Sequence, residues 1–267
     1  MSHHIDLDEL TASERYKLLT ALVIPRPIAW VTTVSSEGIN NAAPYSFFNV
    51  FGQDPAVIIL GLEHKADGTA KDTENNINLL NEFVVNLVSS KVLGNMVDTA
   101  AAYAPGESEP DILGLSLTPS KKVKPPRLTD SPVAIECERI MSLSLSRERS
   151  ILLGRAVGIF AKDGLIDSTT LQVDWANDYP IARLFADQYA EISRIRRFSI
   201  PKPKRALHNK KIVKFKYIVQ VSTSPPKFNV FLNLNDVLKD PYKRFIENKL
   251  KTHFEMNGLP LKIIYKK

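Results

Sequence analysis

Residues 28–62 read IAWVTTVSSEGINNAAPYSFFNVFGQDPAVIILGL, and this stretch decides the fold. IAWVTTV (28–34) is apolar and β-branched, and Glu37-Gly38 supplies a turn before NNAAPYSFF, a pattern typical of a β-hairpin. AVIILGL (56–62) is a continuous apolar run that is short enough to be a fully buried strand. The chain therefore begins its core with consecutive strands.

The sequence outward from this stretch continues the pattern through residue 200. Asp72 is predicted to cap a helix whose apolar side carries Ile77, Leu79 and Leu80. We further expect a strand at 82–88, a helix at 91–103, a loop at 105–126, and two long antiparallel strands at 134–146 and 151–164. Many strands, few helices and no βαβ alternation predict a mainly β fold with some helix, an antiparallel barrel rather than a doubly wound sheet.

The composition is that of an ordinary globular protein, with 44% hydrophobic and 24% charged residues among 267. No apolar run is long enough to predict a membrane span, and no secretory signal opens the chain. Cys137 is the one cysteine, which excludes a disulfide framework and predicts a buried structural thiol. We expect a cytoplasmic protein.

Charge divides the chain into two parts. Residues 201–267 hold 16 Lys and Arg against 4 Asp and Glu, a net charge of +12, whereas residues 1–200 have a net charge of −6. The segment 199–211, SIPKPKRALHNKK, reads as a linker, so we predict domains at 1–203 and 204–267. The basic part is either a solubilising tail or a surface that meets phosphate in RNA or the ribosome.

The basic part has its own element pattern. Two alternating strands, IVKFKYIVQV and KFNVFLNL, flank a Pro-containing turn, and DPYKRFIENKLKTHF reads as a helix with Asp240 as its N-cap and Pro241 at its first position. Its apolar face should carry Tyr242, Phe245, Ile246 and Leu250. With a last strand in LPLKIIYKK, this predicts a small α+β unit of order β-β-α-β.

Common catalytic and metal-binding signatures are missing. The sequence contains no GxSxG, HExxH, phosphate-loop or dinucleotide fingerprint, and its five histidines lack metal-ligand spacing. We therefore predict no dedicated catalytic side chain and no metal site.

Five segments together resemble a known family. PRPIAWVTT (25–33), APYSFFN (43–49), KDTENN (71–76), EFVVN (82–86) and PIARLFADQYAEI (180–192) are similar to the flavin reductase-like, FMN-binding split barrels, in the branch related to flavoredoxin. The resemblance covers roughly residues 10–200. It implies an antiparallel, Greek-key split β-barrel, a homodimer with FMN near the subunit interface, and electron transfer through FMN from NAD(P)H or another donor to an acceptor.

The resemblance also implies which residues bind FMN. The phosphate and ribityl chain would contact Thr32, Thr33, Ser46, Asn49 and the segment Lys71, Asp72 and Thr73. Lys71 and Thr73 flank a predicted helix N-terminus, where free N–H groups favour an anion. Tyr45, Phe47 and Phe48 would shape the isoalloxazine side, and Arg183 and Tyr189 would close the site. The family has glycines where this sequence has Phe185-Ala186-Asp187.

The basic part resembles the KH-like C-terminal domain of EngA (Der), the ribosome-assembly GTPase. The PPxF, YKRxxEN and GxPxxI elements stand at family spacing across residues 210–265. No GTPase domain precedes them, so nucleotide hydrolysis is not inferred. The helix that opens the KH-like domain in that family is absent from this sequence, so the domain is expected to be truncated, and the GxxG loop of RNA-binding KH domains is missing too.

Two functions remain open on the sequence. The first is an FMN-dependent oxidoreductase with a flavin and a small-molecule donor and acceptor as its partners. The alternative is an RNA- or ribosome-associated protein that uses the barrel as a dimerisation scaffold. Bound flavin, or its absence, separates the two.

Overall fold

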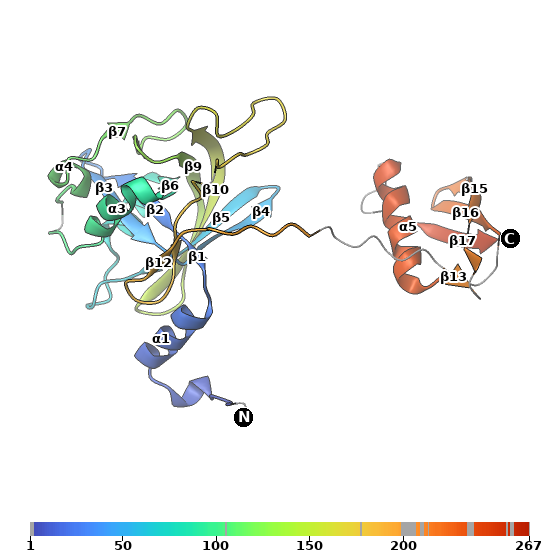
Figure 1. Cartoon of the computed structure of the whole chain (residues 1–267), viewed down its shortest axis with the longest axis horizontal. Coiled ribbons are helices and arrows are strands. Elements are labelled where there is room, and N and C mark those ends of the chain that lie inside the picture. The colour runs from blue at the N-terminus through green and yellow to red at the C-terminus, as the bar shows by residue number, and fades with distance from the viewer. Residues whose placement is uncertain are drawn as a thin grey trace. The chain divides into compact units, whose positions relative to one another are not determined.

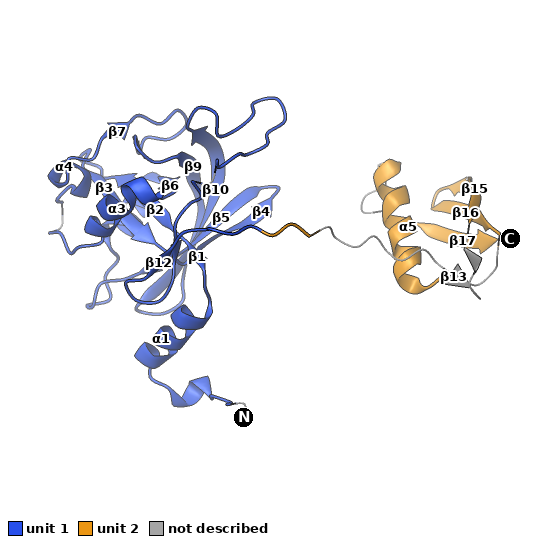
Figure 2. Cartoon of the chain, in the orientation of Figure 1, with its two compact units in different colours: residues 1–195 blue, residues 196–267 orange. Residues whose placement is uncertain are grey.

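The computed structural model describes residues 3–104, 106–176, 178–198, 207–208, 211–212, 214–233, 238–254, 256 and 259–266. The chain forms two compact units, residues 1–195 and 196–267 (Figure 2). The predicted boundary after residue 203 lies outside the described residues and stays a prediction. Among the described helices, none is long and apolar enough to span a membrane.

The first unit is built on one seven-stranded antiparallel sheet (Figure 1). Its strands are β2 (Ala29–Val34), β3 (Asn40–Tyr45), β4 (Phe48–Gln53), β5 (Ala56–Glu63), β6 (Glu82–Asn86), β9 (Val133–Ser144) and β10 (Arg149–Ala161), in the spatial order β3-β2-β6-β9-β10-β5-β4. β3 and β4 are the two edges, yet only Ser46 and Phe47 separate them in the chain. The sheet must therefore curl until its edges meet, which confirms the predicted antiparallel split barrel.

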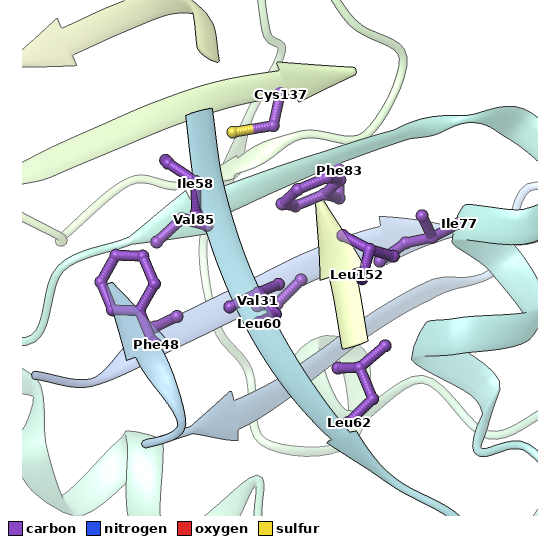
Figure 3. Packing of buried hydrophobic residues seen from close by; sticks show 11 residues of the cluster. Val31, Phe48, Ile58, Leu60, Leu62, Ile77, Phe83, Val85, Cys137 and Leu152 are labelled. Carbon is purple, nitrogen blue, oxygen red and sulfur yellow. The ribbon is translucent and has the colours of Figure 1, made fainter. Parts of the chain in front are cut away.

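The barrel encloses a core formed by alternate residues of its strands. Figure 3 shows Val31, Leu60, Phe83, Val85 and Leu152 converging from the four strands β2, β5, β6 and β10. Cys137 lies in the same cluster as a free, fully buried thiol whose pKa is raised by that burial. The alternation predicted from the sequence thus sets which side chains point inward.

Helices and short segments lie around the barrel. They are η1 (Leu7–Glu9), α1 (Ala12–Leu22), α2 (Asp72–Leu80), η2 (Ser90–Val92), α3 (Leu93–Asp98) and α4 (Glu109–Ile112), with the strands β7 (Leu117–Thr118) and β8 (Arg127–Leu128). The predicted helix at 91–103 is wrong in length, because the α-helix ends at Asp98. The predicted loop at 105–126 contains α4 and β7. Asp72 is not the N-cap of α2: Lys71 occupies that position and makes no side-chain capping bond.

A second, three-stranded sheet fastens the end of the first unit. β1 (Arg26–Pro27) pairs with β11 (Ala182–Arg183), which pairs with β12 (Tyr189–Ala190). Arg26 lies opposite Arg183, and Arg183 opposite Tyr189. Residues more than 150 positions apart in the chain therefore share one small sheet.

The second unit has the predicted β-β-α-β order. β15 (Phe215–Thr223) pairs antiparallel with β16 (Pro226–Leu232), α5 (Asp240–His253) follows, and β17 (Lys262–Lys266) pairs parallel with β16. Two short strands, β13 (Leu207–His208) and β14 (Lys211–Ile212), form a separate pair. Phe228, Val230 and Leu232 of β16 pack against Ile246 and Leu250 of α5 in a small core.

Two details of the predicted helix in this unit are corrected. Lys239, not Asp240, is the N-cap of α5, so Pro241 is the second helical residue rather than the first. Phe245 is 40% exposed and lies beside the buried face rather than on it.

Candidate functional site

The N-terminus of α2 presents the predicted Lys71-Asp72-Thr73 segment. The Lys71 ammonium lies 3.3 Å from Glu63 Oε2, and Lys65 Nζ lies 3.5 Å from Asp72 Oδ1. All four side chains are more than a third exposed, so water screens both ion pairs and either can be exchanged for a ligand at small cost. No side chain caps the first turn of α2, which leaves that turn open to an anion.

A buried polar layer joins α2 to the first hairpin. Asn76 Nδ2 donates to Thr33 Oγ1 at 3.1 Å, and the side chains of Asn41 and Thr73 hydrogen-bond at 2.9 Å. The Asn41 amide fits its neighbours when its oxygen accepts from Thr73 and its nitrogen donates to Glu109 Oε1. A hollow of about 170 Å³ adjoins this layer, with Asn41, Asp72 and Asn76 in its wall.

Thr32 faces a different environment from Thr33. Its hydroxyl donates to the Pro126 carbonyl at 2.6 Å and accepts from Asn86 Nδ2 at 3.1 Å. Because the hydroxyl has only one hydrogen, Thr32 has no donor left for a phosphate. The structure therefore gives Thr32 a part in fastening β2 to residue 126, not a place beside the α2 segment.

The predicted aromatic residues separate into three environments. Phe48 is 9% exposed and belongs to the barrel core. Phe47 is 38% exposed, and its ring centroid lies 6.1 Å from that of Tyr16. Tyr45 is half-buried, and burial raises the pKa of its phenol, although the nearby Thr73 side chain opposes that shift. Asn49 is exposed, and its Oδ1 accepts from the Val50 N–H.

A cavity of about 450 Å³ lies between α1, the end of β3 and the β11–β12 pair. Four predicted residues line it: Tyr45, Ser46, Arg183 and Tyr189. Tyr45 in this wall lies near Thr73 at the N-terminus of α2, because Thr73 is among the groups that affect the pKa of its phenol. The structure thus brings most of the predicted residues together, and leaves Thr32 and Phe48 inside the protein.

Two polar contacts fix the wall formed by β11 and β12. An Arg183 guanidinium N–H donates to the Tyr189 hydroxyl, and the guanidinium carbon lies 4.5 Å from the centre of the Tyr189 ring. The predicted closing pair is therefore in direct contact. Phe185 and Ala186, where the family has glycines, also line the cavity.

Arg26 is the main site residue that sequence analysis missed. It is 8% exposed and donates to the backbone carbonyls of Thr20, Val23 and Leu184, the last at 2.6 Å. Its Nε also reaches Ser46 Oγ at 3.4 Å. No local pattern predicts such partners, because Leu184 lies far along the chain.

The helix α1 was also missed, although its signal is in the sequence. Thr11 and Glu14 form a reciprocal capping box, with the Glu14 N–H donating to Thr11 Oγ1 and the Thr11 N–H donating to Glu14 Oε2. This helix supplies Ser13, Tyr16, Lys17 and Thr20 to the cavity wall. A search for S/T-x-x-E before an apolar run would have found it.

Comparison with known proteins identifies relatives of the first unit. Residues 21–179 match the family model described as a flavin reductase like domain. The 2-nitrobenzoate 2-nitroreductase of Pseudomonas fluorescens is 36% identical, with a TM-score of 0.69 over 74% of this chain and 96% of that one. Component B of nitrilotriacetate monooxygenase from Bacillus cereus is 30% identical, with a TM-score of 0.71 over 74% of this chain and 99% of that one. The family and these structures support a flavin-binding, oxidoreductase-type function.

The second unit matches a different family. Residues 195–266 match the model of the KH-domain-like C-terminal domain of EngA bacterial GTPases. GTPase Der of Christiangramia forsetii is 46% identical over 57 residues, which are 21% of this chain and 13% of that protein. The family match confirms the predicted KH-like domain. The similarity to that GTPase spans only these 57 residues.

Proposed function

This chain belongs to the flavin reductase like domain family, and we propose that it binds FMN as an FMN-dependent oxidoreductase. When bound, FMN would supply the hydride and electron-transfer chemistry that the side chains lack. We propose a small-molecule donor such as NAD(P)H and a small-molecule acceptor. Among the described residues, no cluster of His, Cys, Asp or Glu could hold a metal ion.

The observation that carries this proposal is the grouping of predicted residues at the α2 N-terminus and at the end of β3, where Tyr45 lies near Thr73. FMN has a dianionic phosphate at one end and a flat amphipathic ring at the other, and this region has matching ends. The open first turn of α2 with Lys71 suits the phosphate, and Tyr45, Ser46 and Phe47 suit the ring, which would border a cavity of about 450 Å³ that is large enough for a reactant.

The side chains divide the binding between them in this proposal. Lys71, Thr73 and the backbone N–H groups of the α2 first turn hold the phosphate. Ser46, Phe47 and Tyr45 lie at the ring end, where Tyr45 and Ser46 already line the cavity. Thr33 and Asn41 orient the polar layer behind the ribityl chain. Because the cofactor performs the chemistry, these residues need only bind, orient and exclude water.

We also propose that the first unit is a homodimer. Val50 and Phe51 on the edge strand β4 are 66% and 72% exposed, and Leu22 and Val23 at the end of α1 are also exposed. An edge strand with large exposed apolar side chains is normally covered in the native assembly. A location in the cytoplasm agrees with the single buried thiol.

The test is the cofactor itself. Purified protein should be yellow, with an absorbance maximum near roughly 450 nm, as oxidised flavins have. FMN should bind much more tightly than riboflavin, and Lys71→Ala should weaken FMN binding by about 1–3 kcal/mol, the value of a charge-assisted hydrogen bond.

Lys121→Ala is the matched control, because Lys121 is exposed and lies outside the proposed region. Fluorescence titration of cofactor-stripped protein measures the affinity of the wild type for FMN and for riboflavin, and the affinity of each of the two variants for FMN. Equal affinity for FMN and riboflavin would remove the α2 turn as the phosphate site. A colourless protein that refuses added FMN would remove the proposed function.

A second function is favoured by the surface of the KH-like unit. β15 exposes Tyr217, Ile218, Val219 and Val221, and the Tyr217 ring stacks on Phe231 at 4.4 Å. Lys216 and Lys262 lie exposed on the same small sheet. Aromatic rings with nearby cations suit single-stranded RNA, so we propose weak RNA or ribosome contact through residues 204–267.

A further inference from the structure

The cavity in the first unit carries positive charge without a carboxylate to balance it. Its lining includes Lys17, Arg26 and Arg183, and none of the described lining residues is Asp or Glu. Lys17 interacts with Glu14 one turn earlier on α1, so its charge is partly balanced. Within the described chain, no ion pair joins either arginine to an acid.

Arg26 is a fixed charge. Four of its five N–H donors point to the three backbone carbonyls and to Ser46 Oγ, so the guanidinium cannot turn. Carbonyls satisfy its hydrogen bonds but leave its charge in place, and the residue is buried. Burial lowers the pKa of the Arg26 guanidinium, Tyr16 opposes this, and the like charge of Arg183 lowers it further.

Arg183, unlike Arg26, has N–H donors left over for a ligand. Its bond to Tyr189 uses one of five N–H groups, and its contact with the Tyr189 ring holds the guanidinium against the cavity wall. Two guanidinium groups near one another repel unless an anion lies between or beside them. An anionic ligand would remove that repulsion and gain bidentate hydrogen bonds.

The rest of the cavity wall suits a flat ring. Tyr16, Tyr45, Phe185 and Tyr189 contribute aromatic faces, and Ile28 and Met96 add apolar surface. Hydroxyls occur only at the margins of these rings and on Ser13, Thr20 and Ser46. A cavity of about 450 Å³ with this lining accommodates one or two fused rings.

We propose that this cavity binds the reactant as a small aromatic anion, with its carboxylate or sulfonate against Arg183 in the field of Arg26. The proposal rests on the proposed function, because Tyr45 and Ser46 border both the cavity and the proposed ring end of FMN. A molecule in the cavity then lies beside the flavin ring. The anion belongs to the reactant, and the FMN phosphate stays at the α2 first turn.

The experiment uses a pair of probes with one shape and different charge, 2-naphthoate and 2-naphthamide. Each is titrated by calorimetry into the full-length protein, with FMN and after its removal. Naphthoate should bind roughly tenfold more tightly than naphthamide, as expected for one charge-assisted contact, and added salt should reduce that preference.

Variants then assign the preference to the cavity. Arg183→Gln should lower naphthoate affinity about tenfold and leave naphthamide affinity unchanged, which removes the preference. Arg183→Lys should keep part of it, because the charge remains while the bidentate geometry is lost. Lys121→Gln, an exposed lysine outside the lining, should keep all of it.

Three results would overturn the proposal: equal affinity of the wild type for both probes, a preference that survives in folded Arg183→Gln, or displacement of naphthoate by FMN. Displacement would show that the flavin phosphate occupies the cavity. The proposed function fails separately. If the protein binds naphthoate but not FMN, the proposed oxidoreductase function is contradicted and the anion site stands. If it binds FMN but not naphthoate, only the anion site is contradicted.

Discussion

Glu109 on α4 is a buried acid whose protonation should affect stability. Its Oε2 accepts from the Ala42 N–H at 3.1 Å, and burial raises the pKa of its carboxyl above the ordinary value of 4.5 despite that bond. The folded protein therefore holds this proton to a higher pH than the unfolded chain does. The stabilising effect of the protonated form is complete below the unfolded pKa and is lost as pH rises through the folded pKa.

Glu109→Gln removes this titration. Relative to wild type, the variant should gain stability as pH rises above 4.5, on top of a constant offset from the changed hydrogen bond to Asn41. Urea unfolding of both proteins at several pH values measures the difference. Glu107→Gln is the control, because Glu107 is two residues away and exposed. A difference that stays flat from acid to neutral pH would contradict the prediction.

At the scale of elements, β10 depends on one glycine. A Cβ added to Gly154 would overlap the ring of Phe83, which is fully buried in the barrel core, and the β9–β10 register shifts between Leu153 and Gly154. Gly154→Ala should therefore lower the free energy of unfolding by about 1–3 kcal/mol, the cost of overpacking a core. Gly94→Ala is the control, since nothing lies within 4 Å of its added Cβ and it sits in α3, where alanine should be neutral or stabilising. Equal thermal shifts for the two variants would contradict this assignment.

The elements also show what the sequence could predict. Alternating apolar strands such as 28–34 and 151–164 are visible because one face of each must enter the core. Helix ends are less visible: Lys71 rather than Asp72 is the N-cap of α2, and it makes none of the side-chain capping bonds on which such a prediction relies. The family resemblance singled out Thr33 and Thr73 as FMN contacts, but their hydrogen-bond partners Asn76 and Asn41 came only with the fold. The Arg26 contacts could not be predicted, because backbone carbonyls carry no sequence signature.

The whole molecule joins an acidic barrel unit to a basic KH-like unit, and each has its own core. A chain shortened to residues 1–203 should stay folded, dimeric and flavin-loaded, because the barrel core contains no residue beyond position 195. Gel filtration with light scattering and an absorbance spectrum check this. Loss of folding on truncation would show that the basic part completes the barrel.

The same pair of proteins tests the role of the basic part. Its net charge of +12 either meets polyanions or only keeps the chain dissolved, and salt separates the two. A protein that neutralises several phosphates releases counterions, so log K falls against log salt by about 0.7 for each contact on single strands. The full chain should therefore bind single-stranded RNA weakly, without sequence preference and with steep salt dependence, and residues 1–203 should not bind.

Stacking of bases on Tyr217 and Phe231 adds binding free energy that salt does not screen. Tyr217→Ala should therefore weaken RNA binding at every salt concentration without changing the slope of log K against log salt. Equal RNA binding by both proteins, or none by either at low salt, would show that the basic surface has no nucleic-acid partner.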